Sequence, residues 1–253
     1  MRVKIQEVEM NSGDVSACPA STTFDQTDRN RLKRRHDRGS YDSAVIYPIL
    51  DSALLCHVSY VIDGQPYCTP TGFWREGDDV YWHGSSASRM LREQSKGIDV
   101  CLTVTHMDGL VLARSGFNHS INYRSAMLFG KANRIEQKEQ KARALDAFVD
   151  RFFPGRSETT RKASVQEAKA TSILWMKIEQ ASAKIRAAPP MDDDEDYSIP
   201  VWAGVVPIHT TIGSLIPCAR MNGEIAPGID IADYAEGAAV SDVFAKTYKR
   251  VFG

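Results

Sequence analysis

The sequence predicts a mainly β protein with flanking helices, and three observations support this class. Several short segments alternate apolar with polar residues, as half-buried strands do. Two turn signals, Asp63-Gly64 and Gly77-Asp78, separate such segments in the way that hairpins require. The chain has 253 residues, a length at which β barrels fold as single units. We therefore expect one barrel of at least six strands with helical additions.

The first part of the chain supplies an arm, a basic segment, a helix and the first strands. Residues 1–28 show no sustained period and are predicted as an N-terminal arm. The segment from Arg29 to Arg38 is rich in cations, which fits a solvated face or contact with an acidic loop. Asp42 is placed to cap a helix whose apolar positions share one side. Extended segments are then expected over residues 53–62, 65–75 and 80–82, followed by a helix over residues 87–94.

Similar signals continue through the second part. Strands are expected over residues 98–105, 110–112, 124–135 and 172–178, with Asp108-Gly109 as a hairpin turn. Amphipathic patterns predict helices over residues 138–153 and 240–251. The acidic run from Asp192 to Asp196 lacks the alternate spacing of a calcium loop, so we expect an exposed loop.

Composition excludes several classes of partner. The formal net charge of -1 gives no electrostatic case for nucleic acid. The 5 cysteines show no CxxC spacing, and buried free thiols in a reducing compartment explain them best. No apolar run follows a basic start, and no stretch reaches the length of a membrane span. We place the protein in the cytoplasm, with neither nucleic acid nor membrane as a partner.

A serine-rich turn that ends in arginine is the strongest chemical signal. His83-Gly84-Ser85-Ser86-Ala87-Ser88-Arg89 leads from a short aromatic strand into the predicted helix. Free backbone N–H groups, hydroxyls and a cation at such a point suit a phosphate. The competing interpretation is that Ser85 or Ser86 only caps the helix and that His83 only ends a strand.

Other catalytic motifs do not appear. The histidines show neither HxH nor HExxH spacing, so we predict no metal site. No GxSxG elbow and no GxGxxG after a strand are present, and GSSASR lacks the ending of a Walker loop. The sequence therefore lacks the central motifs of serine hydrolases and of Rossmann dinucleotide-binding domains.

The order of strand, turn, strand, serine-rich turn and arginine resembles the FMN-binding split barrel of pyridoxamine 5'-phosphate oxidase. Further blocks resemble its flavin-binding relatives, the nitroimidazole resistance proteins included: RRHDRGSYD (34–42), NYRS (122–125), SAK (182–184) and VWAG (201–204). The resemblance implies a split β-barrel domain over residues 29–215, with residues 216–253 as an extension packed on the barrel or a partner subunit.

By this resemblance, the strand beside the flavin ring and the phosphate turn supply the cofactor contacts. The residues carried over are Thr69, Pro70, Thr71, His83, Gly84, Ser88 and Arg89. Thr69 and Thr71 are two apart, so in a strand their hydroxyls share one face, although a pair of surface threonines would do the same. The chain has Met90 where the oxidases have a second cation, so the Arg34, Arg35 and Arg38 cluster is a candidate for the missing charge.

Three later positions are secondary candidates. The resemblance implies that Tyr123 and Ser125 reach flavin across a twofold interface, and that Trp202 closes over the cofactor. Ordinary places in the sheet and in the core are the competing interpretations. Lys184 either offsets the acidic loop or meets cofactor phosphate.

We expect a homodimeric FMN-dependent oxidoreductase that passes electrons from a donor such as reduced nicotinamide to a small acceptor, nitroaromatics included. The cofactor performs the redox step, so no acid or base is assigned. The alternative is a flavin- or haem-binding protein without turnover, with His57, His83 or His119 as the axial ligand. A barrel without cofactor, used for protein interaction, is the third interpretation.

Overall fold

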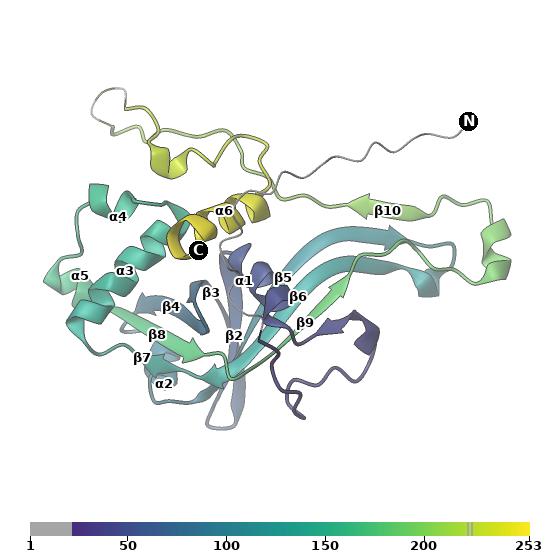
Figure 1. Cartoon of the computed structure of the whole chain (residues 1–253), viewed down its shortest axis with the longest axis horizontal. Helices are drawn as coiled ribbons and strands as arrows, with labels where there is room; N and C mark the ends of the chain where they lie inside the picture. Colours follow the sequence, from purple (N-terminus) through teal and green to yellow (C-terminus); the bar gives the residue numbers. More distant parts are fainter. Residues whose placement is uncertain (1–21, 222, 224) are drawn as a thin grey trace, which may run out of the picture.

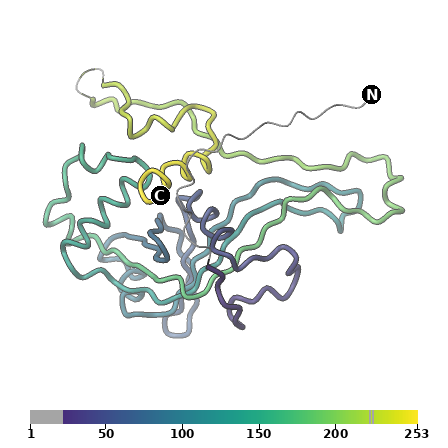
Figure 2. Tube along the Cα trace, in the orientation of Figure 1, coloured from purple at the N-terminus to yellow at the C-terminus, as the bar shows by residue number. Residues whose placement is uncertain are grey.

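The computed structural model describes residues 22–221, 223 and 225–253, which form one antiparallel sheet with helices around it (Figures 1 and 2). The main path of the sheet runs β1-β9-β6-β5-β2-β3-β4-β8-β7, and β10 pairs with β5. The strands are β1 (Gly39–Ser40), β2 (Leu55–Ile62), β3 (Gln65–Glu76), β4 (Asp79–Ser85), β5 (Asp99–Leu112), β6 (Ser120–Lys131), β7 (Asn133–Arg134), β8 (Thr171–Lys177), β9 (Gln180–Arg186) and β10 (Gly204–Pro207).

The sheet curls into a split barrel because β3, and the consecutive strands β8 and β9, link its two halves. β3 pairs with β2 as far as Gly72 and with β4 from Phe73 onward. β8 pairs with β4, and β9, which follows after a short turn, pairs with β6. At this closure a Cβ on Gly130 would collide with the carbonyl oxygen of Lys177, so a side chain there would push β6 and β8 apart.

The helices close one end of the barrel and cover part of its outside. They are α1 (Ser43–Asp51), α2 (Arg89–Gln94), α3 (Lys138–Phe152), α4 (Arg156–Thr159), α5 (Val165–Ala170) and α6 (Val240–Phe252), with 3-10 turns η1 (His36–Arg38), η2 (Gly116–Asn118), η3 (Asp194–Ser198) and η4 (Ile229–Ile231). α1 places Ile46, Ile49 and Leu50 in the barrel core. α3 packs on the outer face of β3, β4 and β8, and α6 packs on α3 and α1.

A buried arginine fastens these helices to the sheet. Arg75 on β3 donates from Nε and Nη2 to the carboxylate of Asp51, at 2.9 and 2.6 Å. Its guanidinium lies over the rings of Tyr47 and Tyr248, at 4.1 and 4.6 Å from their centroids. Burial of the pair is tolerated because the carboxylate balances the charge, accepts two hydrogen bonds, and leaves the guanidinium faces in contact with aromatic rings.

Most elements predicted from the sequence are confirmed, and the β class with flanking helices is confirmed. One turn was predicted wrongly: β5 runs through Asp108 and Gly109, with a register shift after Met107. A Cβ at Gly109 would lie 3.0 Å from the carbonyl oxygen of Val206, so this glycine admits β10 instead of making a turn. Asp108 pairs with Arg124 at 2.9 Å, and the chain reverses at η2.

β5, β6 and β9 continue beyond the barrel as a long arm, with β10 beside it (Figure 1). The acidic run was predicted as an exposed loop, which is wrong for Asp192. Its carboxylate accepts hydrogen bonds from the backbone of Arg114 and Ser115, at 2.9 and 3.3 Å, and pairs with the Arg114 guanidinium. The remaining acids form the exposed turn η3.

The cysteines divide between inside and outside, so the prediction of buried thiols holds only in part. Cys56 is buried, Cys101 is half-buried, and Cys68 and Cys218 are exposed; all four are free. Cys18 lies outside the described residues, as does most of the predicted arm. Within the described part, Phe24 of that arm packs on the core. No helix in the described part is long and apolar enough to cross a membrane.

Candidate flavin and haem sites

The predicted phosphate turn forms between β4 and α2. Ser88 N donates to Ser85 O at 2.9 Å, and Ser86 N donates to Ala170 O at 2.7 Å, so the turn is held at both ends. α2 begins at Arg89, two residues later than predicted. Ser88 occupies its N-cap position, but its hydroxyl makes no capping hydrogen bond. The capping interpretation concerned Ser85 or Ser86, and the Ser85 hydroxyl does accept from Ala87 N at 3.3 Å. The Ser88 hydroxyl is left for another acceptor.

Arg89 continues this turn toward an aromatic stack. Its guanidinium lies 4.8 Å from the centre of the Tyr67 ring. Tyr67 stacks on Tyr60 with centroids 5.5 Å apart and an interplanar angle of 15°. Tyr60 in turn reaches the Thr69 hydroxyl, with 3.2 Å between the oxygens. Among the described residues no carboxylate pairs with Arg89, so its charge is free for an anion.

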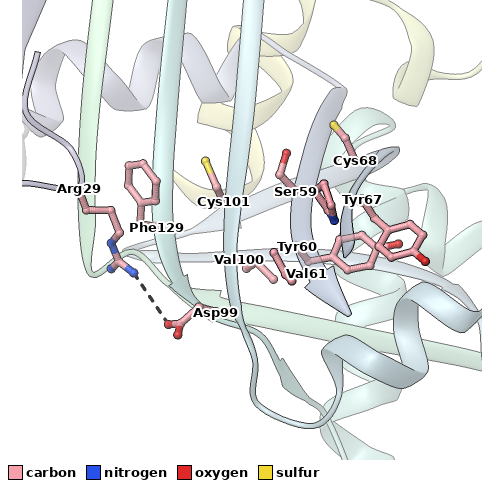
Figure 3. Close-up of a pocket in the computed structure, with 11 residues that line it drawn as sticks. Arg29, Ser59, Tyr60, Val61, Tyr67, Cys68, Asp99, Val100, Cys101 and Phe129 are labelled. Carbon is pink, nitrogen blue, oxygen red and sulfur yellow. Dashed lines mark ion pairs between the residues drawn. The ribbon is translucent and has the colours of Figure 1, made fainter. Parts of the chain in front are cut away.

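The stack borders a pocket of about 490 Å³ at the open edge of β2, β3 and β5 (Figure 3). Tyr60 and Tyr67 lie at one end, and Arg29 and Asp99 lie at the other, with 3.8 Å between the charged atoms of this pair. The floor between them is mostly apolar and includes Cys101. The aromatic wall suits a flat ring system. Arg89 does not line the pocket and adjoins it through its contact with Tyr67.

β3 presents its predicted contacts on two faces. Thr69 and Thr71 share a face as predicted, but that face is half-buried and turned toward Tyr60 inside the barrel. Pro70 lies exposed on the opposite face, directly across from His57 of β2. Gly84 on β4 lets α2 pack closely, because a Cβ at this position would lie 3.0 Å from Leu91 of α2. Its role in packing is therefore visible, whereas contact with cofactor stays a prediction.

His83 lies away from the stack, on the face of β4 that α3 covers. Its ring contacts Phe148 of α3 edge-on, at 4.3 Å between centroids, and Trp74 at 6.3 Å. Its Nδ1 atom is buried and has no hydrogen-bond partner. Burial lowers the pKa of His83 below its ordinary value, so the ring is neutral near pH 7. A neutral imidazole with an unused nitrogen is the form that binds iron.

The other two candidate histidines are different. His57 is exposed on the outer face of β2. His119 is exposed at the arm, and its Nδ1 lies 2.9 Å from the carbonyl oxygen of Ser115. Of the three, His83 has the buried surroundings in which a haem ligand is held.

The secondary candidates lie on other strands. Tyr123 and Ser125 are on β6, which β5 and β2 separate from β3, so the structure does not bring them to Arg89 within one chain. The Ser125 hydroxyl donates to Lys184 O at 3.2 Å. Trp202 is 63% exposed beside Gly204 on the arm and covers no pocket residue. Lys184 donates to the carbonyl oxygen of Arg34 at 3.1 Å and not to the acidic loop, and its contact with cofactor phosphate stays a prediction.

Sequence reasoning missed the tyrosine stack. Tyr60 and Tyr67 face each other across the hairpin at Asp63-Gly64. Counting outward from that two-residue turn pairs positions 62 with 65 and 60 with 67, so the signal was present.

Fold and site together define the class as a split barrel with the flavin-binding fold. The family model for pyridoxamine 5'-phosphate oxidase matches residues 42–185, and the chain belongs to this family. A flavocytochrome from Azotobacter vinelandii is 43% identical, with a TM-score of 0.78 over 83% of this chain and 98% of that one. A protein from Mycobacterium smegmatis described as binding FAD and haem is 35% identical, with a TM-score of 0.75 over 79% and 98%. No curated protein matches the chain.

Proposed function

We propose that this protein is an oxidoreductase that holds a flavin at the Arg89 turn and a haem beside His83, and passes electrons to a small acceptor. Family membership supports the flavin, and the two relatives described as a flavocytochrome and as an FAD- and haem-binding protein support the pair. Flavin and haem, expected as alternatives from the sequence, are proposed here together. Nitroaromatic compounds belong in the first screen of acceptors.

The observation that carries the flavin site is the unpaired Arg89 guanidinium above the Tyr67 ring. Arg89 and the Ser88 hydroxyl would bind the phosphate, because charged hydrogen bonds to phosphate are the stronger kind. The pocket wall formed by Tyr60 and Tyr67 would orient the rest of the molecule and exclude water from one side. Thr69 acts from inside the barrel by fixing the Tyr60 hydroxyl.

The observation that carries the haem site is the buried, unpartnered Nδ1 of His83. Phe148 and Trp74 keep water from the imidazole, and burial keeps it neutral. A bound flavin supplies two-electron and one-electron chemistry, and a bound haem supplies one-electron chemistry.

We also propose that the active form is a homodimer. Apolar side chains project from the outer face of the sheet, among them Leu55 and Val61 on β2, Met107 on β5, and Ile121 and Met127 on β6. Tyr123 and Ser125 lie on this same face. A second copy covering the face would bury the apolar surface and bring these hydroxyls to its own cofactor.

The first test is the visible spectrum of the purified protein, followed by titration with FMN and with FAD under fluorescence detection. We expect flavin absorption together with a Soret band, and saturable binding near one flavin per chain. A colourless protein that binds neither cofactor contradicts the proposal and favours an interaction barrel.

The axial ligand is tested by comparing three histidine variants. We expect His83→Ala to lose the Soret band, whereas His57→Ala and His119→Ala keep it. Retention of an unchanged Soret band in folded His83→Ala contradicts the assignment. For the dimer, Met127→Lys should shift the mass measured by ultracentrifugation toward the monomer and weaken flavin binding with it.

A further inference from the structure

One edge of the sheet gathers four cations that the proposed function does not use. β1 pairs with β9 so that Gly39 lies opposite Lys184, and η1 contacts β9 beside it. β6 pairs with the other side of β9, which places Tyr123 opposite Arg186 and Ser125 opposite Lys184. Arg35 and Arg38 come from η1 and the residue before it, so the four cations belong to two segments that are far apart in sequence. Figure 2 shows the course of the chain through both segments.

Arg186 is the fixed centre of this cluster, and among the residues that the structure describes no carboxylate forms an ion pair with it. Its side chain is 5% exposed and donates to Asn122 Oδ1 at 2.5 Å and to the carbonyl oxygens of Ala188 and Pro189 at 2.8 and 3.1 Å. Its Nε atom is buried without a partner. Neutral acceptors orient a guanidinium without cancelling its charge, so the field of Arg186 remains available.

The neighbouring arginines add to the positive charge around Arg186. Burial lowers the pKa of Arg186, and Arg38 and Arg35 lower it further by repulsion. Within the described residues, the acid paired with any of the four cations is Asp37, which lies 3.4 Å from Arg35. Four cations beside one carboxylate repel one another, and a bound anion would relieve that repulsion.

The backbone is strained at the same place. Arg35 adopts the left-handed conformation, with φ 52 and ψ 48, which a side chain of this size rarely takes. The conformation is held by hydrogen bonds from Arg38 N to Arg35 O and from Lys184 Nζ to Arg34 O, both at 3.1 Å. Strain that the surroundings maintain in this way is typical of ligand sites.

We propose that Arg35, Arg38, Lys184 and Arg186 form a second anion site, which binds the pyrophosphate of a dinucleotide. Arginine forks match phosphate oxygens in pairs, and the Tyr123 hydroxyl stands on the same face as a further donor, because Tyr123 lies opposite Arg186. β6, β5, β2 and β3 lie between β9 and β4, which leads into the turn before Arg89, so the two sites are distinct within one chain.

Two molecules could supply the pyrophosphate. Both belong to the proposed function, so the inference rests on that function. One source is a flavin adenine dinucleotide whose flavin is held by a second copy of the chain. The other is a reduced nicotinamide dinucleotide that donates electrons. The recognised chemistry, two linked phosphates, is the same in both.

The test compares the double variant Arg35→Ala/Arg38→Ala with the control Arg31→Ala/Lys33→Ala. The control removes the same charge from the same segment, but its two side chains line a separate pocket. Calorimetry with inorganic pyrophosphate is done on full-length protein whose fold is checked by melting. Loss of two charged hydrogen bonds should weaken pyrophosphate binding at least about tenfold in the double variant and leave the control near wild type. Arg38→Lys, which keeps the charge, should retain more affinity than Arg38→Ala.

The same variants separate the sources. If the affinity for FAD falls while the affinity for FMN does not, the ligand is the cofactor; if only the KM for reduced nicotinamide rises, the ligand is the donor. Equal pyrophosphate affinity in the two double variants, or none in the wild type, overturns the second site. Flavin binding that persists in that case leaves the proposed function standing, whereas pyrophosphate binding without flavin binding refutes the function alone.

Discussion

Two arginines are buried to nearly the same extent and differ in what surrounds them. Arg75 is 7% exposed and Arg186 is 5% exposed. Burial lowers the pKa of Arg75, but the hydrogen-bonded Asp51 more than offsets this, and the pKa lies above its ordinary value. At Arg186 burial and the neighbouring arginines act in the same direction, and the pKa is lowered. Arg75 with its acid serves the fold, whereas the charge of Arg186 is not cancelled by an acid among the described residues and can act on a ligand.

The largest expected effect follows from breaking the Arg75 pair. Arg75→Met leaves the Asp51 carboxylate buried without its partner, and should lower the free energy of unfolding by about 3–5 kcal/mol. Denaturant unfolding followed by circular dichroism measures this. Asp51→Leu combined with Arg75→Met should recover much of the loss, since no charge is then left buried; a double variant as unstable as the single one would contradict this account.

Arg89 is an exposed arginine to compare with the buried Arg75. Arg89→Ala removes a charged hydrogen bond to phosphate and should weaken flavin binding by about 1.5–3 kcal/mol. Its stability should stay near wild type, because the side chain is exposed. Fluorescence titration compares it with Arg92→Ala, an exposed arginine on the same helix. Equal flavin affinity in the two variants would remove Arg89 from the site.

A smaller loss of stability is expected at Arg186. Arg186→Met removes hydrogen bonds to Asn122 and to two carbonyl groups but leaves no charge unpaired, so the unfolding free energy should fall by about 1–2 kcal/mol. The same unfolding experiment applies. A loss of unfolding free energy as large as that of Arg75→Met would show that Arg186 stabilises the fold as strongly as the Arg75–Asp51 pair does. It would contradict the comparison.

The smallest effect is a pH dependence at His83. Its folded pKa lies below the ordinary value of 6.5, so the unfolded state binds the proton more readily. The stability that the neutral ring contributes is complete above about pH 6.5 and is lost as the pH falls toward the folded pKa. His83→Phe should flatten that part of the curve of stability against pH, while His119→Phe should leave it unchanged. Parallel curves for His83→Phe and wild type would contradict a buried neutral histidine.

Local signals in the sequence were reliable where neighbours decide the structure. The Asp42 cap begins α1 as predicted, with its carboxylate accepting from Ala44 N at 2.8 Å. The alternation along β3 placed Thr69 and Thr71 on one face, but which face looks into the barrel depends on pairing with β2. Asp108-Gly109 has the composition of a turn, yet Gly109 pairs with Pro207 of β10, and no local rule contains that contact.

The candidate site shows the same division. The serine-rich turn and Arg89 were predictable because a phosphate turn is built from consecutive residues. The Arg89 contact with Tyr67 was not, because Arg89 begins α2 and Tyr67 lies on β3. Arg186 carried no signal at all: its environment is assembled by β6, β9 and η1, which meet only in the folded chain.

The sequence by itself determined the elements, the hairpins and the residues of the phosphate turn, since hydrogen bonds and side-chain period over a few residues suffice for these. Only the tertiary structure decided that α3 covers His83 and buries its Nδ1 atom, that Arg75 has an acid, and that Arg186 has none among the described residues. Burial and charge pairing depend on groups brought together from distant parts of the chain, and those groups set the free energy of a proton or an ion at each place.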